Sequence, residues 1–255
     1  MDERGSARFR RKVAPWISIG TAGLACWVAA CGSDGGPRGV VADQVVDAPG
    51  ATGVGFEDPQ KAVNGVRGGG DSAGGTDVFS LGYVAGGNDT LVLRWSGRRV
   101  QNGPGADLAV FENPFVIGNS GAAFLDPAIV SVSSDGTTWV EFPHAYLATD
   151  PTKYQADPAL WKGFAGITPV RWNVDTNDVD PFDRKAAGGD EFDLDDLPQG
   201  DAEADVLRHD GFRFVRIQSA ATQVNPDTGV PYPHDPSATG PDIDGVAARY
   251  LVPDQ

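Results

Sequence analysis

Cysteine is almost absent from this sequence. The only two cysteines among its 255 residues are Cys26 and Cys31, both near the N-terminus. The chain beyond residue 31 therefore contains no thiol, which excludes disulfide bonds and a cysteine nucleophile from that part. Its stability has to come from a hydrophobic core, with bound metal as a further source.

Catalytic motifs in the structural context that they require are missing as well. The three histidines, His144, His209 and His234, show no H-x-x-x-H or H-x-H spacing, so a zinc site has little support. The G-x-S-x-G match at residues 70–74 lies in a glycine-rich run with no predicted strand before it, and so lacks the strand–turn–helix context in which this motif presents a serine nucleophile. These absences predict a protein that is not an enzyme. Carboxylate pairs leave glycoside hydrolysis as the least favoured alternative, with these rim carboxylates as its candidates: Asp107, Glu112, Asp190 and Asp244.

Positive charge is scarce. Beyond residue 31 the chain has 15 Lys and Arg against 33 Asp and Glu, a net charge of −18. Such a surface repels nucleic acid and anionic lipid headgroups, so we expect no nucleic-acid partner. The same acidity suits divalent cations.

The N-terminus has the pattern of an export signal. A basic start precedes an uncharged, mostly apolar run over residues 13–30, and Val28-Ala29-Ala30-Cys31 resembles the bacterial lipobox. We therefore predict a lipoprotein signal peptide at residues 1–31, with Cys31 as the lipidated residue. Cleavage nearby without lipid and an uncleaved anchor are the alternatives, and Arg10-Arg11 hints at twin-arginine export.

This pattern also predicts a location. The chain would be exported and anchored by lipid on Cys31 to the bacterial cell envelope, either at the cell surface or on a membrane facing the periplasm. Residues 32–39 (GSDGGPRG) would form a flexible tether. Residues 40–255 are predicted to form a single β-sandwich domain, and two small β domains are the alternative at this length.

Short strands dominate the remaining sequence. The 34 Gly and 19 Pro are typical of a strand-and-turn architecture, and no segment shows a sustained helical period. Asp135-Gly136 predicts a tight hairpin. We therefore predict an all-β fold, a two-sheet antiparallel sandwich of jelly-roll type. The clearest strands lie at residues 78–84, 90–95, 107–112, 128–133, 137–142, 212–218 and 246–251.

Acidic segments suggest calcium, which prefers carboxylate, amide and carbonyl oxygens. The stretch from Asp175 to Asp196 is rich in acids, but its spacing is not that of an EF-hand, because Val179 falls at a position that needs a ligand. A looser calcium site built from loops remains, and a solvated acidic surface or turn-capping carboxylates are the alternatives. The candidate metal ligands are Asp107, Glu112, Asn113, Asp190, Asp193, Asp242 and Asp244.

Aromatic residues in loops are candidates for stacking against sugar rings. Trp161, Trp172, Tyr146 and Tyr154 fall in the loop-rich middle of the chain. They are the predicted ligand-binding residues. The alternative is that these loop aromatics only cover the edge of the sandwich. Trp95 and Trp139 fall in predicted strands and are expected in the core.

Several motifs in series resemble a family of bacterial "cell surface proteins". They include Val110-Phe111-Glu112-Asn113, Gly188-Gly189-Asp190-Glu191-Phe192 and Asp242-Ile243-Asp244-Gly245, within roughly residues 40–251. The resemblance implies an exported lipoprotein with an uncharacterised β-sandwich. Ser133-Ser134-Asp135-Gly136 followed by Trp139 is also similar to discoidin-like, galactose-binding-like sandwiches, which bind glycans through loops at one rim.

The sequence thus favours a non-catalytic cell-surface module that binds carbohydrate or another extracellular partner, with calcium ordering its loops. A structural envelope protein that contacts other proteins through its sheet edges is the alternative.

Overall fold

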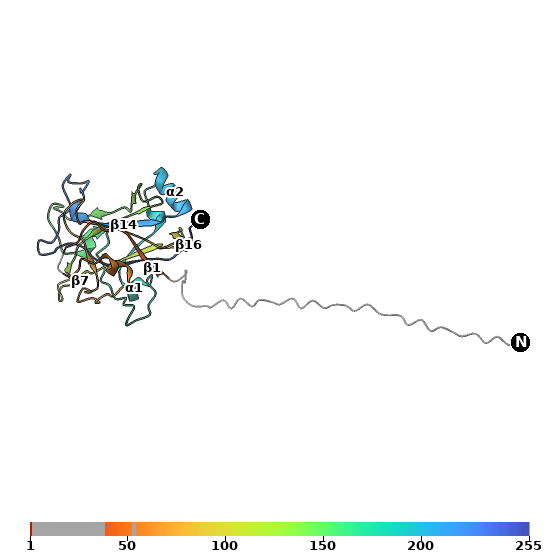
Figure 1. The fold of residues 1–255 in the computed structure, drawn as a ribbon. Coiled ribbons are helices and arrows are strands. Elements are labelled where there is room, and N and C mark those ends of the chain that lie inside the picture. The colour runs from red at the N-terminus through yellow and green to blue at the C-terminus, as the bar shows by residue number, and fades with distance from the viewer. Residues whose placement is uncertain (2–38, 53–54, 255) are drawn as a thin grey trace. The chain divides into compact units, whose positions relative to one another are not determined.

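The computed structural model describes residue 1, residues 39–52 and residues 55–254. The described residues from 39 onward belong to one compact unit, drawn as a ribbon in Figure 1. The predicted signal peptide, its Cys31 and almost all of the predicted tether lie outside the described residues. No helix in the described ranges has the length and apolarity needed to cross a membrane.

The first of two larger sheets has five antiparallel strands in the order β1-β15-β6-β13, and β3 also pairs with β15. The register shifts between Ile243 and Gly245, where β15 contains a bulge against β6. The strand bounds are β1 Val40–Val41, β3 Phe79–Ser80, β6 Leu108–Glu112, β13 Asp190–Phe192 and β15 Asp242–Ala248.

The second larger sheet also has five antiparallel strands, in the order β10-β9-β14-β4-β2. The predicted hairpin at Asp135-Gly136 joins β9 to β10, and Gly136 adopts the positive φ of 78° that such a turn requires. The strand bounds are β2 Gln44–Asp47, β4 Thr90–Arg94, β9 Ala128–Ser133, β10 Val140–Glu141 and β14 Phe214–Ser219.

Three short strand pairs and a few helical turns complete the described elements. The pairs are β5 Arg98–Val100 with β16 Leu251–Pro253, β7 Phe115–Val116 with β8 Ala123–Phe124, and β11 Ala145–Tyr146 with β12 Trp161–Lys162. The helices are η1 Pro59–Val63, η2 Pro158–Leu160, α1 Arg184–Ala187, η3 Leu194–Asp196, α2 Ala202–Asp210 and η4 Ala220–Thr222.

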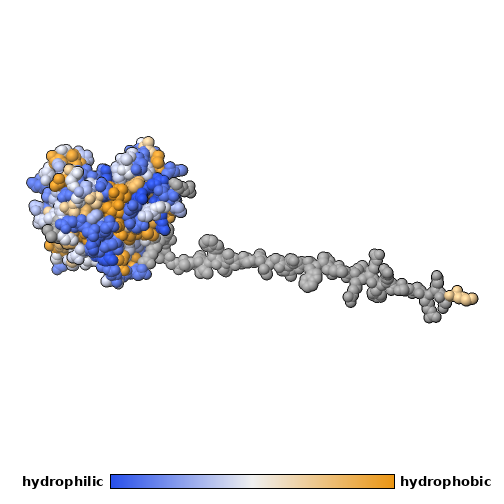
Figure 2. All heavy atoms as spheres, in the orientation of Figure 1, coloured by the Kyte–Doolittle hydropathy of each residue, from blue (hydrophilic) through white to orange (hydrophobic). Residues whose placement is uncertain are grey.

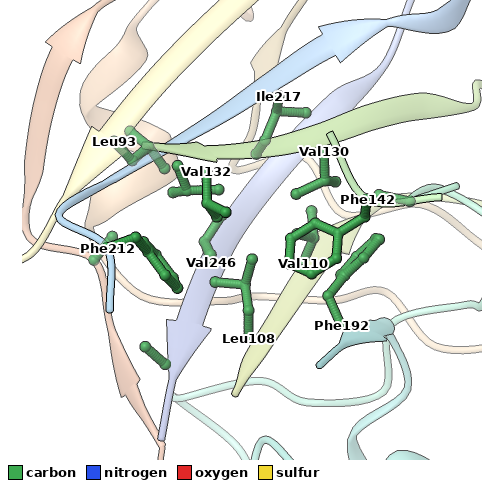
Figure 3. Packing of buried hydrophobic residues seen from close by; sticks show 14 of the residues in the cluster. Leu93, Leu108, Val110, Val130, Val132, Phe142, Phe192, Phe212, Ile217 and Val246 are labelled. Carbon is green, nitrogen blue, oxygen red and sulfur yellow. The ribbon is translucent and has the colours of Figure 1, made fainter. Parts of the chain in front are cut away.

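The main hydrophobic core lies between the two larger sheets. Alternation along each strand places every second side chain in this layer, since successive residues point to opposite faces of a sheet. Figure 3 shows side chains of the two sheets pointing toward one another: Leu93, Val130, Val132 and Ile217 from the second sheet, and Leu108, Val110 and Val246 from the first.

The outer face of the first sheet is covered by a second cluster of apolar residues. Phe111 of β6 packs edge-on against Trp172, with ring centroids 5.2 Å apart. We call this cluster the covering layer. Its buried members are Val66, Ala109, Phe111, Val170, Trp172, Phe182, Ala187 and Ala247.

The mainly β architecture with two larger antiparallel sheets confirms the predicted fold class at this level. The helix α2 was not expected. Asp201 caps its N-terminus by accepting hydrogen bonds from the backbone N–H groups of Glu203 and Ala204, but only two of its nine residues are buried. Two buried residues are too few to produce the repeating apolar pattern by which an amphipathic helix is recognised in a sequence.

Candidate functional site

The outer face of the second sheet carries the most accessible aromatic and hydrogen-bonding surface of the two larger sheets. Along β14, Val215 and Ile217 enter the core, whereas Phe214, Arg216 and Gln218 point outward and are half-buried. The outward residues of the neighbouring β4 lie beside them, because Arg216 pairs with Val92 and Gln218 with Thr90. We call this surface, together with Trp139 and the adjoining residues of β2, the open face.

Two cation–π contacts organise the open face. The guanidinium carbon of Arg216 lies 4.7 Å from the centroid of the Trp139 ring, and that of Arg94 lies 5.9 Å from the Phe214 ring. Both distances fall within the range of attractive contacts. Trp139 directly precedes β10 and is half-buried, so part of its ring remains accessible to solvent.

Hydrogen bonds hold the polar side chains of the open face in place. Arg216 donates from Nε to Ser131 Oγ at 3.0 Å, and Gln218 donates from Nε2 to Thr90 Oγ1 at 3.2 Å. Partial burial lowers the pKa of Arg216, against the raising effect of Glu141 and Asp89. The nearest atoms of Arg216 and Glu141 are 3.9 Å apart, at the edge of ion-pair range.

A shallow groove runs over the open face. Its volume is about 390 Å³, which matches the lower part of the range for small-ligand sites. Aromatic rings beside planar hydrogen-bonding groups suit a sugar ring, which presents C–H groups on its face and hydroxyls at its edge. The lining residues include Val46, Asp47, Thr90, Val92, Gly136, Trp139, Phe214, Arg216 and Gln218.

The four aromatic residues predicted to bind a ligand lie elsewhere. Trp161 and Tyr146 stack on each other with centroids 3.9 Å apart and are 2% and 3% exposed, and Trp172 belongs to the covering layer. A sugar ring arriving from solvent has no open face to stack on at these three residues. Tyr154 is half-buried, and its hydroxyl donates to the Leu125 carbonyl at 3.1 Å.

The predicted metal ligands are distributed over several separate hydrogen-bond networks. Asp107 accepts from the backbone N–H of Gly103 at 2.8 Å and of Leu194 at 2.9 Å. Burial raises its pKa to about 7, against the lowering effect of these two hydrogen bonds. Asp193 accepts from the backbone N–H of Asp195 and caps η3. These two residues therefore order the segment around η3.

Asp190 and Asn113 also bind backbone groups. Asp190 accepts from the N–H of Ile167 at 2.9 Å and from the Thr168 hydroxyl at 2.8 Å, and burial raises its pKa. Asn113 accepts from the N–H of Gly75 at 2.8 Å. Each of these side chains attaches a loop to the first sheet.

Asp244 is fully buried beneath the covering layer. It accepts from the backbone N–H of Arg67 at 2.8 Å, whereas its second oxygen accepts no hydrogen bond among the described residues. Burial is the main cause that raises its pKa to about 7.

The two remaining predicted ligands, Glu112 and Asp242, are in direct contact with each other. Glu112 accepts from the backbone N–H of Asp242 at 2.9 Å, and Asp242 accepts from the hydroxyl of Ser80. Burial raises the pKa of both carboxyls.

In the described ranges, no three His, Cys, Asp or Glu side chains lie close enough together to hold a metal ion.

The sequence analysis did not single out a buried carboxyl close to Glu112. Asp126 is almost fully buried just before β9, and the signal that could have found it was an Asp-Pro step at the start of a long apolar strand.

Trp139 and Arg216 were missed for a different reason. Trp139 was expected in the core, whereas it lies on the outward side of its strand, opposite Val140. The alternation of Val140 and Phe142 could have placed Trp139 on the opposite face of the strand, but alternation alone does not tell which of the two faces is exposed to solvent.

The chain matches no model of a known protein family and no curated protein.

Proposed function

We propose that this chain is a non-catalytic carbohydrate-binding module whose glycan contacts the open face of the second sheet. The observation that carries the proposal is the half-buried Trp139 ring stacked on Arg216 beside the groove. A pyranose ring would stack on the aromatic surface, and its hydroxyls would bond with Arg216, Gln218 and Asp47. The covering layer gives the first sheet no equivalent surface.

The lipobox-like sequence supports a location outside the cytoplasm, with the module anchored to the bacterial envelope through Cys31. The two five-stranded sheets suit a jelly-roll sandwich, a fold often used by lectins. Figure 2 shows apolar patches set among hydrophilic residues on the side of the molecule that it presents. Such a mixed surface is compatible with binding polar, weakly amphipathic ligands.

A glycan array on the purified full-length chain is the first test, followed by calorimetric titration with the glycans that bind. Trp139→Ala should weaken binding at least about tenfold, because removing one well-packed stacking contact costs about 1.4 kcal/mol or more. Arg216→Lys should weaken it less, since lysine keeps the charge but loses the planar fork.

Phe124→Ala is the matched control. Phe124 is half-buried and stacks on Phe115 in the separate β7–β8 pair, with ring centroids 5.2 Å apart. This variant should keep full affinity. If the folded wild-type chain binds no glycan on the array, or if Trp139→Ala binds as tightly as wild type, the proposal fails.

A further inference from the structure

A groove with a volume of about 480 Å³ lies over the β5–β16 pair, beside the start of β1. Val40 lines this groove, and the indole Nε1 of Trp95 donates to the Val40 carbonyl at 2.8 Å. Val40 also pairs with Ala248, which directly precedes Arg249 of the same groove. Contacts with two other segments therefore hold the first strand of the domain at this groove.

The groove is basic, although the chain carries a large excess of acidic residues. Arg98 and Arg249 line it, and none of the described residues that line it is acidic. Neither arginine forms an ion pair with another described residue. Charge complementarity thus favours an anionic ligand in this groove.

The guanidinium of Arg249 is held in place without a direct counter-ion. Its carbon lies 4.2 Å from the centroid of the Phe182 ring, and its Nε is buried with no hydrogen-bond acceptor among the described residues. Burial raises the pKa of Glu191, and Arg184 and Arg249 oppose this effect from beyond ion-pair distance. A partly buried cation without a direct partner costs free energy, which an anion in the groove would lower.

The other walls of the groove are firmly packed and partly apolar. The Tyr250 hydroxyl donates to the Pro104 carbonyl at 2.6 Å, and a Cβ on Gly103 would stand 2.4 Å from the Tyr250 ring. Val40, which is 43% exposed, and Val252 add apolar surface. Tyrosine and apolar side chains beside arginines suit the boundary between lipid headgroups and acyl chains.

We infer that this groove binds the phosphate group of a membrane phospholipid. Val40 is nine residues after Cys31, and a fully extended chain of that length spans about 30 Å. A lipid on Cys31 would therefore keep the groove close to the membrane surface. The inference rests on the lipid anchor of the proposed function, but not on its glycan binding.

Bound phosphate would also orient the domain. Arg98 and Arg249 would donate charge-assisted hydrogen bonds to its oxygens. The acidic remainder of the surface is repelled by anionic headgroups, so the groove would be the face that turns toward the membrane.

The test is calorimetric titration of the purified full-length chain with dihexanoyl phosphatidylglycerol, a short-chain lipid, below its critical micelle concentration. Arg98→Gln and Arg249→Gln should each weaken binding about tenfold or more, because each removes hydrogen bonds to a charged group. Arg249→Lys should keep part of the affinity, since lysine retains the charge. The affinity of the wild type should fall as the salt concentration rises.

Arg184→Gln is the matched control. Arg184 lies outside this groove and also forms no ion pair with a described residue, so the variant loses the same charge and should keep full affinity. Arg98 is exposed, and Arg98→Gln should melt at the wild-type temperature. It therefore keeps the test decisive even if Arg249→Gln unfolds.

Titration with inorganic phosphate distinguishes a lipid headgroup from a soluble ligand. Weaker binding of inorganic phosphate than of the lipid supports the inference. Equal affinity for both, lost in the same variants, would overturn it in favour of a soluble phosphate ligand. It is also overturned if wild type binds no lipid, or if Arg98→Gln binds the lipid as tightly as wild type. Glycan binding that persists in these variants would leave the proposed function standing.

Discussion

The outer faces of the two larger sheets differ although the sheets have the same number of strands. All five residues of β6 in the first sheet are buried, because the covering layer lies over their outward side chains. In β14 of the second sheet, buried and half-buried residues alternate. The difference teaches that the loops, more than the strands, decide which face of this molecule meets solvent. It also identifies the face on which the proposed glycan binding can be tested.

The largest expected contrast is in the cost of removing an aromatic ring. Phe111→Ala should lower the free energy of unfolding by about 3–5 kcal/mol, because Phe111 is fully buried against Trp172 and its loss leaves a cavity. Urea unfolding of wild type and variant measures the difference. A cost below about 1 kcal/mol would show that the covering layer does not pack firmly on the first sheet.

A second contrast concerns pH. Asp244, under the covering layer, has its pKa raised to about 7 mainly by burial. Between about pH 4 and 7 the unfolded chain therefore loses a proton that the folded chain keeps, so stability falls as pH rises through this range. Asp244→Asn should remove the contribution of Asp244 to this decrease in the free energy of unfolding, which is on the order of a few kcal/mol at most.

The control for this pH effect lies beside the open face. Backbone hydrogen bonds from Thr138 and Thr137 hold the pKa of the exposed Asp135 below its usual range, so its contribution to stability is lost only as pH falls below about 4. Urea unfolding at several pH values should give Asp135→Asn the wild-type slope between pH 5 and 7. An unchanged slope for Asp244→Asn would contradict the assignment.

The smallest effect is expected on the open face itself. Phe214→Ala should cost less than about 1 kcal/mol, since the ring is half-buried and its main described partner is the Arg94 guanidinium at 5.9 Å. The same urea measurement checks this value. A cost approaching that of Phe111→Ala would mean that the open face is covered in solution, for example by another copy of the chain.

Strand positions could be predicted where alternation and turn chemistry agree. The strand at residues 128–133 was predicted with the bounds of β9, and Asp135-Gly136 fixed the following hairpin. The strand predicted at residues 212–218 corresponds to β14, which lies between β9 and β4 in the second sheet. Long-range pairing, such as that of β1 with β15, leaves no local trace in the sequence.

The candidate sites were harder to predict because burial depends on contacts between distant segments. Trp161 follows a loop and was expected to be accessible, but the stack with Tyr146 across the β11–β12 pair buries it. Asp126 and Glu112 are 14 residues apart and meet beside Gly166, which comes from a third segment. No periodic pattern in a single sequence shows that residues from three separate segments lie close together in the fold.

The N-terminal edge strands have a consequence for the order of folding. Val40 pairs with Ala248, roughly 200 residues later in the chain. Asp43, two residues after β1, donates a hydrogen bond from its backbone N–H to the Arg94 carbonyl in the second sheet. The segment from β1 to β2 therefore contributes to an edge of each larger sheet, although β1 finds its partner only after nearly all of the chain has been synthesised. Until then β1 has no partner strand, and an unpaired strand edge can pair with a strand of another chain and lead to aggregation.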